Sequence, residues 1–120
     1  MSWDGKDRRG AKRYGIKNST VVFRRGDWLA FLAPPSPTYL LLNVGMTGCH
    51  FICKEDLAVG SSLRLSIEIP HHKGTIRARG AVIWTRRSSD QTAFHVGVRF
   101  TGLGSRSRGL LKNVLDGAIL

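Results

Sequence analysis

The segment Leu63–Ile69 alternates between apolar and polar side chains without a fault, with the apolar residues at odd positions. Successive side chains of a β-strand point to opposite faces, so this period of two indicates a strand with one buried face. Phe94–Phe100 alternates in the same way, with apolar residues at even positions. No helical crossover separates the strand candidates, so antiparallel pairing is expected rather than parallel βαβ units.

Further strand candidates occupy much of the remaining chain. They are Ile16–Phe23, Trp28–Leu32, Tyr39–Leu42, Cys49–Ile52 and Ile76–Trp84. Near the C-terminus the apolar residues take the spacing of one helical face. These residues are Leu110, Leu111, Val114, Leu115, Ala118 and Ile119. Ser105 or Ser107 is suited to cap that helix. The sequence therefore predicts an all-β fold of six or seven antiparallel strands, closed or nearly closed into a small barrel, followed by a helix.

A turn with two glycines, Asn43–Gly48, separates two of these strands. We expect Gly45 or Gly48 to adopt backbone angles that other residues avoid. Pro34–Pro37 is incompatible with a helix or a central strand and is expected to form a loop. Thr85–Thr92 is polar and is expected to be a hairpin loop.

A chain of 120 residues is long enough for one domain with a modest core. We expect residues 1–6 to be a flexible lead-in and residues 7–120 to form that domain. No apolar stretch approaches the ~18–20 residues that span a bilayer, and no apolar secretory segment follows the charged N-terminus. A soluble cytoplasmic protein without a membrane span is expected. Cys49 and Cys53 are too far apart on one strand for a disulfide, so both are expected to be reduced and buried.

The net charge of +11 indicates anionic partners. Residues 1–25 hold eight Lys and Arg against two Asp, and such a segment is also typical of a solvated arm. Within it Arg9 and Arg13 lie four residues apart, with Arg8 beside them. Arginine makes bidentate contacts with phosphate and stacks on flat rings. Asn43–Gly48 offers a side-chain amide and backbone N–H groups, so arm and turn together suit a ligand with phosphates and a base.

Arg9-x-x-x-Arg13, followed thirty residues later by Asn43-x-Gly45-x-x-Gly48, resembles the signature of the PilZ domain family, RxxxR and then (D/N)xSxxG. Arg79–Trp84 resembles the family's strand that ends in an aromatic residue, and Gly97–Phe100 resembles its closing G-V-x-F strand. The resemblance extends from Asp7 to the terminal helix.

The resemblance implies a six-stranded antiparallel PilZ-type β-barrel with a C-terminal α-helix, and a receptor for bacterial cyclic di-GMP that has no catalytic activity and needs no cofactor. Arg9 and Arg13 would hold phosphates and guanine faces, with Arg8 assisting, and Asn43 would bond a guanine edge. The implied ligand-binding residues are Arg8, Arg9, Arg13, Asn43, Gly45, Gly48 and Trp84. Gly48 would shape the turn, and Trp84 would pack near the ligand or, alternatively, in the core.

Two departures from the family pattern weaken the implied site. Gly45 stands where the family has serine, and the lost hydroxyl contact of about 0.5–1.5 kcal/mol predicts roughly tenfold weaker binding. Asn43 replaces a possible aspartate and gives up a charge-assisted bond to guanine N–H groups. The loop Pro34–Pro37 also lengthens the gap between the two motifs.

Three functions follow. In the first, cyclic di-GMP orders the basic arm, and the new surface signals to a protein partner that the sequence does not identify. In the second, a degenerate PilZ adaptor binds protein but ignores the nucleotide. In the third, which the resemblance disfavours, a basic barrel with three Trp binds single-stranded nucleic acid.

Other chemistry has weaker support. Cys49, His50, Cys53 and the three remaining histidines lack the paired short spacing of zinc ligands, so no metal site is expected. Gly102-Leu103-Gly104 lacks the third glycine of a dinucleotide fingerprint and is interpreted as the approach to the helix. No nucleophile–base–acid arrangement is visible, so an enzyme is not expected.

Overall fold

The computed structural model describes residues 12–26 and 32–119. The expected lead-in 1–6 and most of the expected strand Trp28–Leu32 lie outside these ranges. The elements, in chain order, are β1 (Arg13–Tyr14), β2 (Thr20–Arg25), β3 (Tyr39–Gly45), β4 (Gly48–Cys53), β5 (Ser62–Glu68), β6 (Ile76–Arg87), β7 (Phe94–Leu103) and α1 (Ser105–Ile119).

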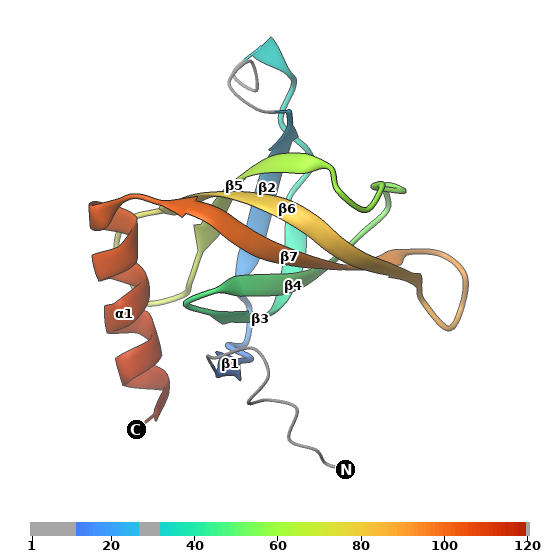
Figure 1. Cartoon of the computed structure of the whole chain (residues 1–120). Coiled ribbons are helices and arrows are strands. Elements are labelled where there is room, and N and C mark those ends of the chain that lie inside the picture. The colour runs from blue at the N-terminus through green and yellow to red at the C-terminus, as the bar shows by residue number, and fades with distance from the viewer. Residues whose placement is uncertain (1–11, 27–31, 120) are drawn as a thin grey trace.

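Six strands form a closed antiparallel barrel, as predicted. They are joined in the order β3-β2-β5-β6-β7-β4, and the β3–β4 pairing closes the ring. The two-residue strand β1 is an addition on β3. Figure 1 shows α1 beside one end of the barrel, with the β6–β7 hairpin projecting on the opposite side. Closure gives the six strands partners on both sides over part of their length, so the barrel has few open edges.

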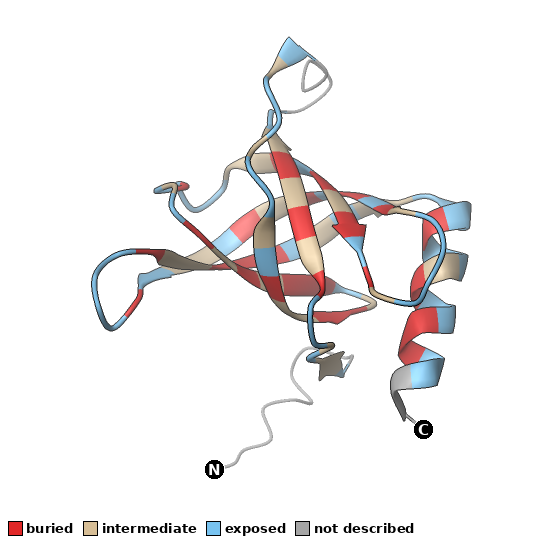
Figure 2. Ribbon diagram, turned by 180° about the vertical axis from the view of Figure 1, so that it is seen from behind, coloured by how far each residue is buried: buried red, intermediate tan, exposed pale blue. Residues whose placement is uncertain are grey.

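The core follows from the alternation in the sequence. Leu63, Leu65 and Ile67 on β5 point inward and are almost completely buried, whereas Arg64 and Glu68 are exposed. Figure 2 shows the same succession of buried and more exposed residues along the neighbouring strands. Because every strand contributes one apolar face to the interior, the polar side chains of the same strands are left on the outside of the barrel.

Helix α1 covers the core with the apolar face that the spacing predicted. Leu111, Val114 and Leu115 are buried in the same cluster as the strand residues. The predicted N-cap is wrong, because the helix already begins at Ser105 and Gly104 precedes it. The Ser107 hydroxyl instead accepts a hydrogen bond of 2.9 Å from the backbone N–H of Arg77, which ties α1 to β6.

The predicted six-residue turn Asn43–Gly48 is mostly strand. Asn43 pairs with His50 and Val44 with Cys49, so only Met46 and Thr47 separate β3 from β4. The expectation of unusual backbone angles at Gly45 or Gly48 is also wrong. The described glycines with positive φ are Gly26, Gly60 and Gly74.

Two other strand boundaries differ from the prediction. The segment Ile16–Ser19 is not strand but a turn, closed by a Ser19 N–H to Ile16 carbonyl bond with Asn18 at a φ of 65°. Asparagine tolerates this left-handed conformation better than most residues. At the other hairpin, Thr85–Arg87 continue β6 because they pair with β7, so the loop is shorter than expected. The Arg87 guanidinium lies 4.9 Å from the ring centroid of Phe94.

Both cysteines are free and buried, as predicted. Among the described residues no helix combines the length and apolar character that a membrane span requires.

Candidate ligand-binding face

The two motifs that lie thirty residues apart in the sequence meet at β1. Arg13 is the register partner of Gly45, and Tyr14 is the register partner of Val44. The last arginine of RxxxR therefore runs antiparallel to the glycine-containing motif, at adjacent-strand distance. Arg8 and Arg9 lie outside the described residues.

Gly45 and Gly48 allow this close packing because they have no side chain. A Cβ at Gly45 would lie 2.4 Å from the Lys12 carbonyl oxygen, on the backbone leading into β1. A Cβ at Gly48 would lie 2.2 Å from the Val98 carbonyl oxygen and 2.8 Å from Arg13 Nη2. The absence of a side chain at Gly45 thus lets the backbone before β1 pack closely against β3. The absence of one at Gly48 leaves room for both β7 and the guanidinium of Arg13.

The positive charge of Arg13 also affects the pKa of the buried Cys49 thiol. Burial raises the pKa of the Cys49 thiol to about 12, and the positive charge of Arg13 opposes part of that rise. The Cys49 thiol is therefore neutral at physiological pH and acts as a small apolar side chain beneath the site.

Asn43 begins a chain of side-chain hydrogen bonds across the outside of the barrel. Asn43 Nδ2 lies 3.3 Å from His50 Nδ1, and His50 Nε2 lies 2.9 Å from His95 Nδ1. An amide nitrogen can only donate, so Nδ1 of His50 accepts and Nε2–H of His50 donates to His95. Asn43 Oδ1 is buried and accepts no hydrogen bond from the described residues. The described residues therefore leave the accepting capacity of this oxygen unused.

Trp84 joins this chain because Gly97 leaves a gap between strands. Gly97 is the register partner of both His50 on β4 and Trp84 on β6. A Cβ at Gly97 would lie only 2.1 Å from Trp84 Nε1, so the indole occupies the space where a side chain would be. The indole thereby comes within 5.0 Å of the His50 ring, measured between ring centroids.

The structure thus brings four of the seven predicted site residues to one side of the barrel. We call the outward surface formed by Arg13, Asn43, Gly48, His50 and Trp84 the candidate face. It combines a guanidinium, a buried amide oxygen and a half-buried aromatic ring. Such a set can bind an anion next to a flat, hydrogen-bonding ring system. Gly45, the fifth described residue of the prediction, lies on β3 directly beside β1.

A scan of family models identifies the chain from residue 7 to residue 117 as a PilZ domain. The chain belongs to the PilZ domain family. The match covers both sequence motifs and nearly all of the barrel and helix, so the resemblance seen in the sequence is confirmed.

Solved structures share the fold of this PilZ domain at low sequence identity. Inhibitor of motility (MotI/DgrA) of Bacillus subtilis matches with a TM-score of 0.66 and 16% identity, over 92% of this chain and 51% of its own. The MrkH–c-di-GMP complex of K. pneumonia gives 0.71 and 11%, over 92% and 51%. The c-di-GMP-bound PilZ domain of YcgR from Escherichia coli gives 0.62 and 12%, over 93% and 92%.

The chain therefore spans about half the length of the MotI and MrkH chains and nearly all of the isolated YcgR domain. A search of curated proteins found no match.

Sequence reasoning did not assign His50 and His95 to the site of this PilZ domain. His95 occupies a polar position of an alternating strand, and the strand period placed His50 on the face opposite Cys49. Their proximity depends on the β4–β7 pairing, in which Ile52 is opposite His95 and His50 is opposite Gly97. Diagonal neighbours on adjacent strands are within reach of long side chains. The missing information was therefore the strand order.

Trp84 is not a core residue, which excludes the alternative considered from the sequence. It is absent from the buried cluster and has intermediate exposure. His50 faces away from the buried Cys49, as the strand period predicted. Within residues 12–26 and 32–119, no three His, Cys, Asp or Glu side chains form a group that could hold a metal ion.

Proposed function

We propose that this PilZ domain is a receptor for cyclic di-GMP and has no catalytic role. The observation that carries the proposal is the pairing of Arg13 with Gly45, which makes one surface from both motifs. The c-di-GMP-bound state of the similar YcgR domain and MrkH supports the same ligand class here. The family match also supports treating residues 7–120 as one domain.

The candidate face supplies a contact for each part of that ligand. Arg13, with Arg9 and Arg8 from the preceding segment, binds the phosphates through charge-assisted hydrogen bonds. Asn43 Oδ1 accepts from the N–H groups on a guanine edge, which satisfies its buried lone pairs. The rings of Trp84 and His50 offer apolar contact to the flat base.

Ligand binding orders the basic arm that contains Arg8 and Arg9. The negative phosphates draw the positive arm onto the barrel beside β1, and the ligand's greater affinity for the ordered state provides the free energy. The folded-back arm then presents a surface that a protein partner recognises. The signal is therefore a change of surface and involves no chemical reaction.

Calorimetric titration of the full chain with cyclic di-GMP tests the proposal, with GTP and single-stranded DNA as competing ligands. Arg13→Ala and Arg9→Ala should each weaken binding by about tenfold or more, because hydrogen bonds to charged groups contribute about 1.5–3 kcal/mol. Arg106→Ala is the matched control, since Arg106 is an exposed arginine on α1. Circular dichroism establishes that each variant is folded. Unchanged affinity in both Arg9→Ala and Arg13→Ala would exclude this ligand site.

A second function, a PilZ adaptor that binds protein without nucleotide, is favoured by one observation. The space that the family's serine side chain would need at Gly45 is taken by the Lys12 carbonyl. An adaptor would give neither heat nor amide chemical-shift changes at high micromolar cyclic di-GMP. That result in the wild-type chain would select the adaptor over the receptor.

A further inference from the structure

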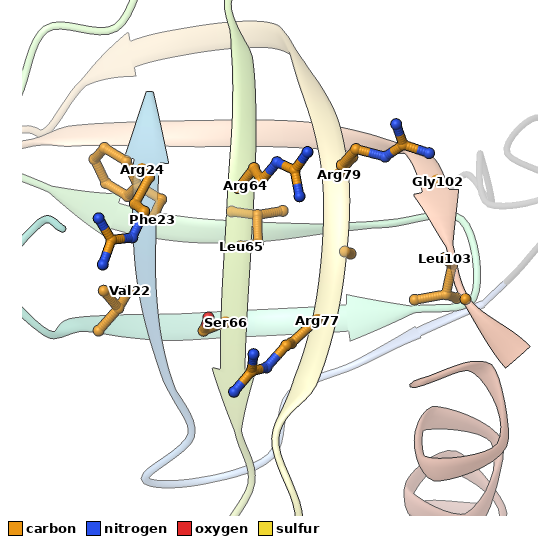
Figure 3. A pocket seen from close by; sticks show the side chains of 12 residues that line it. Val22, Phe23, Arg24, Arg64, Leu65, Ser66, Arg77, Arg79, Gly102 and Leu103 are labelled. Atoms are coloured by element: carbon orange, nitrogen blue, oxygen red, sulfur yellow. The ribbon is translucent and has the colours of Figure 1, made fainter. Parts of the chain in front are cut away.

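A groove of about 450 Å³ lies on the outside of the barrel, over β2, β5 and the first half of β6. Four arginines line it: Arg24, Arg64, Arg77 and Arg79. Figure 3 shows their side chains on three neighbouring strands of the same sheet. None of the candidate-face residues lines the groove, so the two surfaces are separate.

Three of these arginines form a row across the sheet. Arg64 is the register partner of Arg24 on one side and of Arg79 on the other. Adjacent strands are ~4.8 Å apart, so the three backbone positions span roughly 10 Å. Like charges directly opposite one another destabilise a sheet. The row therefore concentrates positive charge on one side of the sheet.

Two of the four arginines carry a charge that no described acidic side chain pairs with. Within the described residues neither Arg77 nor Arg79 has an ion-pair partner, and both are exposed. Arg24 donates a hydrogen bond to the Ala33 carbonyl, which holds the side chain but leaves its charge in place. Glu68 is the acidic residue of β5, and it is not among the residues that line the groove.

At one end of the groove the Arg79 side chain is held in place by close packing. The Arg79 side chain lies over Gly102, where a Cβ would be 2.8 Å from Arg79 Nε. Gly104 also lines the groove. It immediately precedes α1, whose first turn has no acidic side chain. The partial positive charge at the start of α1 therefore adds to the field of the arginines.

We propose that this arginine groove binds a compact ligand with linked phosphate groups, either a nucleoside di- or triphosphate or free inorganic polyphosphate. The volume is in the range of small-molecule sites. A phosphate carries up to about two negative charges near neutral pH, compared with one for a carboxylate. Linked phosphates therefore place more negative charge beside the exposed guanidinium groups of Arg77 and Arg79, in a small space, than an acidic peptide does.

The described lining also argues against single-stranded nucleic acid. Such strands are held by aromatic side chains on which bases stack. The aromatic residue of the lining, Phe23, is almost completely buried and offers no ring face. Arginine is well suited to phosphate because its planar fork makes two parallel hydrogen bonds to one group.

The test is calorimetry of the full chain at low salt with inorganic triphosphate, and in parallel with ATP and GTP. The double variant Arg77→Gln/Arg79→Gln should weaken triphosphate binding by about tenfold or more, the loss expected for at least one charge-assisted hydrogen bond. Arg87→Gln/Lys112→Gln is the matched control, because it removes the same charge at two exposed positions outside the groove. The control should change affinity less than threefold.

A conservative variant separates shape from charge. Arg77→Lys/Arg79→Lys keeps the net charge and loses the bidentate geometry, so it should bind triphosphate with intermediate affinity. Thermal unfolding establishes that the three double variants are folded. Tighter binding of ATP or GTP than of triphosphate would assign the nucleotide as the source of the phosphates, and equal binding would assign inorganic polyphosphate.

The outcomes are distinguishable from those of the cyclic di-GMP proposal. Arg13→Ala should leave triphosphate binding intact, and Arg77→Gln/Arg79→Gln should leave cyclic di-GMP binding intact. The groove proposal is overturned if wild type does not bind triphosphate, or if groove and control variants lose affinity equally. It is also overturned if a poly-glutamate peptide, but no phosphate compound, requires Arg77 and Arg79, or if cyclic di-GMP itself requires them.

Discussion

Replacing Gly45 with serine, the residue that the PilZ motif has at this position, should weaken cyclic di-GMP binding. The motif alone suggests the opposite, because a restored hydroxyl would add about 0.5–1.5 kcal/mol. In the structure, however, a Cβ at Gly45 would lie 2.4 Å from the Lys12 carbonyl oxygen and 3.1 Å from Arg13 Cγ. Real Cβ atoms essentially never approach closer than 3.0 Å, so the backbone of β3 or the backbone before β1 must shift.

The size of the effect is the difference between two terms. Overpacking of this kind costs about 1–3 kcal/mol. The free protein relieves it by loosening the two-residue strand β1, but binding through Arg13 requires β1 to return. The central values are about 2 kcal/mol for the overpacking and about 1 kcal/mol for the hydroxyl gain, so a net loss of about 1 kcal/mol is expected. This corresponds to affinity that is about fivefold lower.

Calorimetry of Gly45→Ser and Gly45→Ala against wild type measures this balance. Both variants introduce the Cβ, and only serine adds the hydroxyl, so alanine should bind more weakly than serine. Amide exchange at Arg13 and Tyr14 should be faster in both variants, because β1 is loosened. Tenfold tighter binding by Gly45→Ser, with exchange in β1 unchanged, would refute the reasoning.

Two further changes test the packing around the candidate face. Gly97→Ala should lower the free energy of unfolding by about 1–3 kcal/mol, because its Cβ meets the Trp84 indole at 2.1 Å; thermal denaturation measures this. Gly109→Ala is the control and should be neutral or stabilising, since nothing lies within 4 Å of the added Cβ in α1. Cys49, whose pKa is raised by burial from 9.0 to about 12, should resist alkylation at pH 8 in the folded protein and react on unfolding. Between pH 9 and pH 12 the Cys49 thiol ionises in the unfolded chain but stays neutral in the folded protein, so the free energy of unfolding should decrease with pH over that range. Below pH 9 the thiol is neutral in both states and its stabilising effect is complete. A free energy of unfolding that increases from pH 9 to pH 12 would contradict this prediction.

Local pattern was sufficient for the elements whose environment is uniform along their length. The alternation of Leu63–Ile69 predicted a strand with the observed inward residues, because one face of β5 is buried throughout. The helical spacing near the C-terminus predicted the buried face of α1 for the same reason. The paired motifs predicted where a ligand site should be, and the family match confirmed the family that they indicate.

Closure of the barrel determines which residues become neighbours across the sheet, and the pattern of apolar and polar residues in the sequence does not contain this information. Gly45 and Gly48 are required for close approach to Lys12, Val98 and Arg13, all distant in sequence, and not for unusual backbone angles. In the same way, His50 meets His95, and Arg64 lies between Arg24 and Arg79, through strand pairings between segments that are far apart in the chain. A one-dimensional pattern records which side of a strand a residue occupies, whereas the neighbour across the sheet depends on strand order and register.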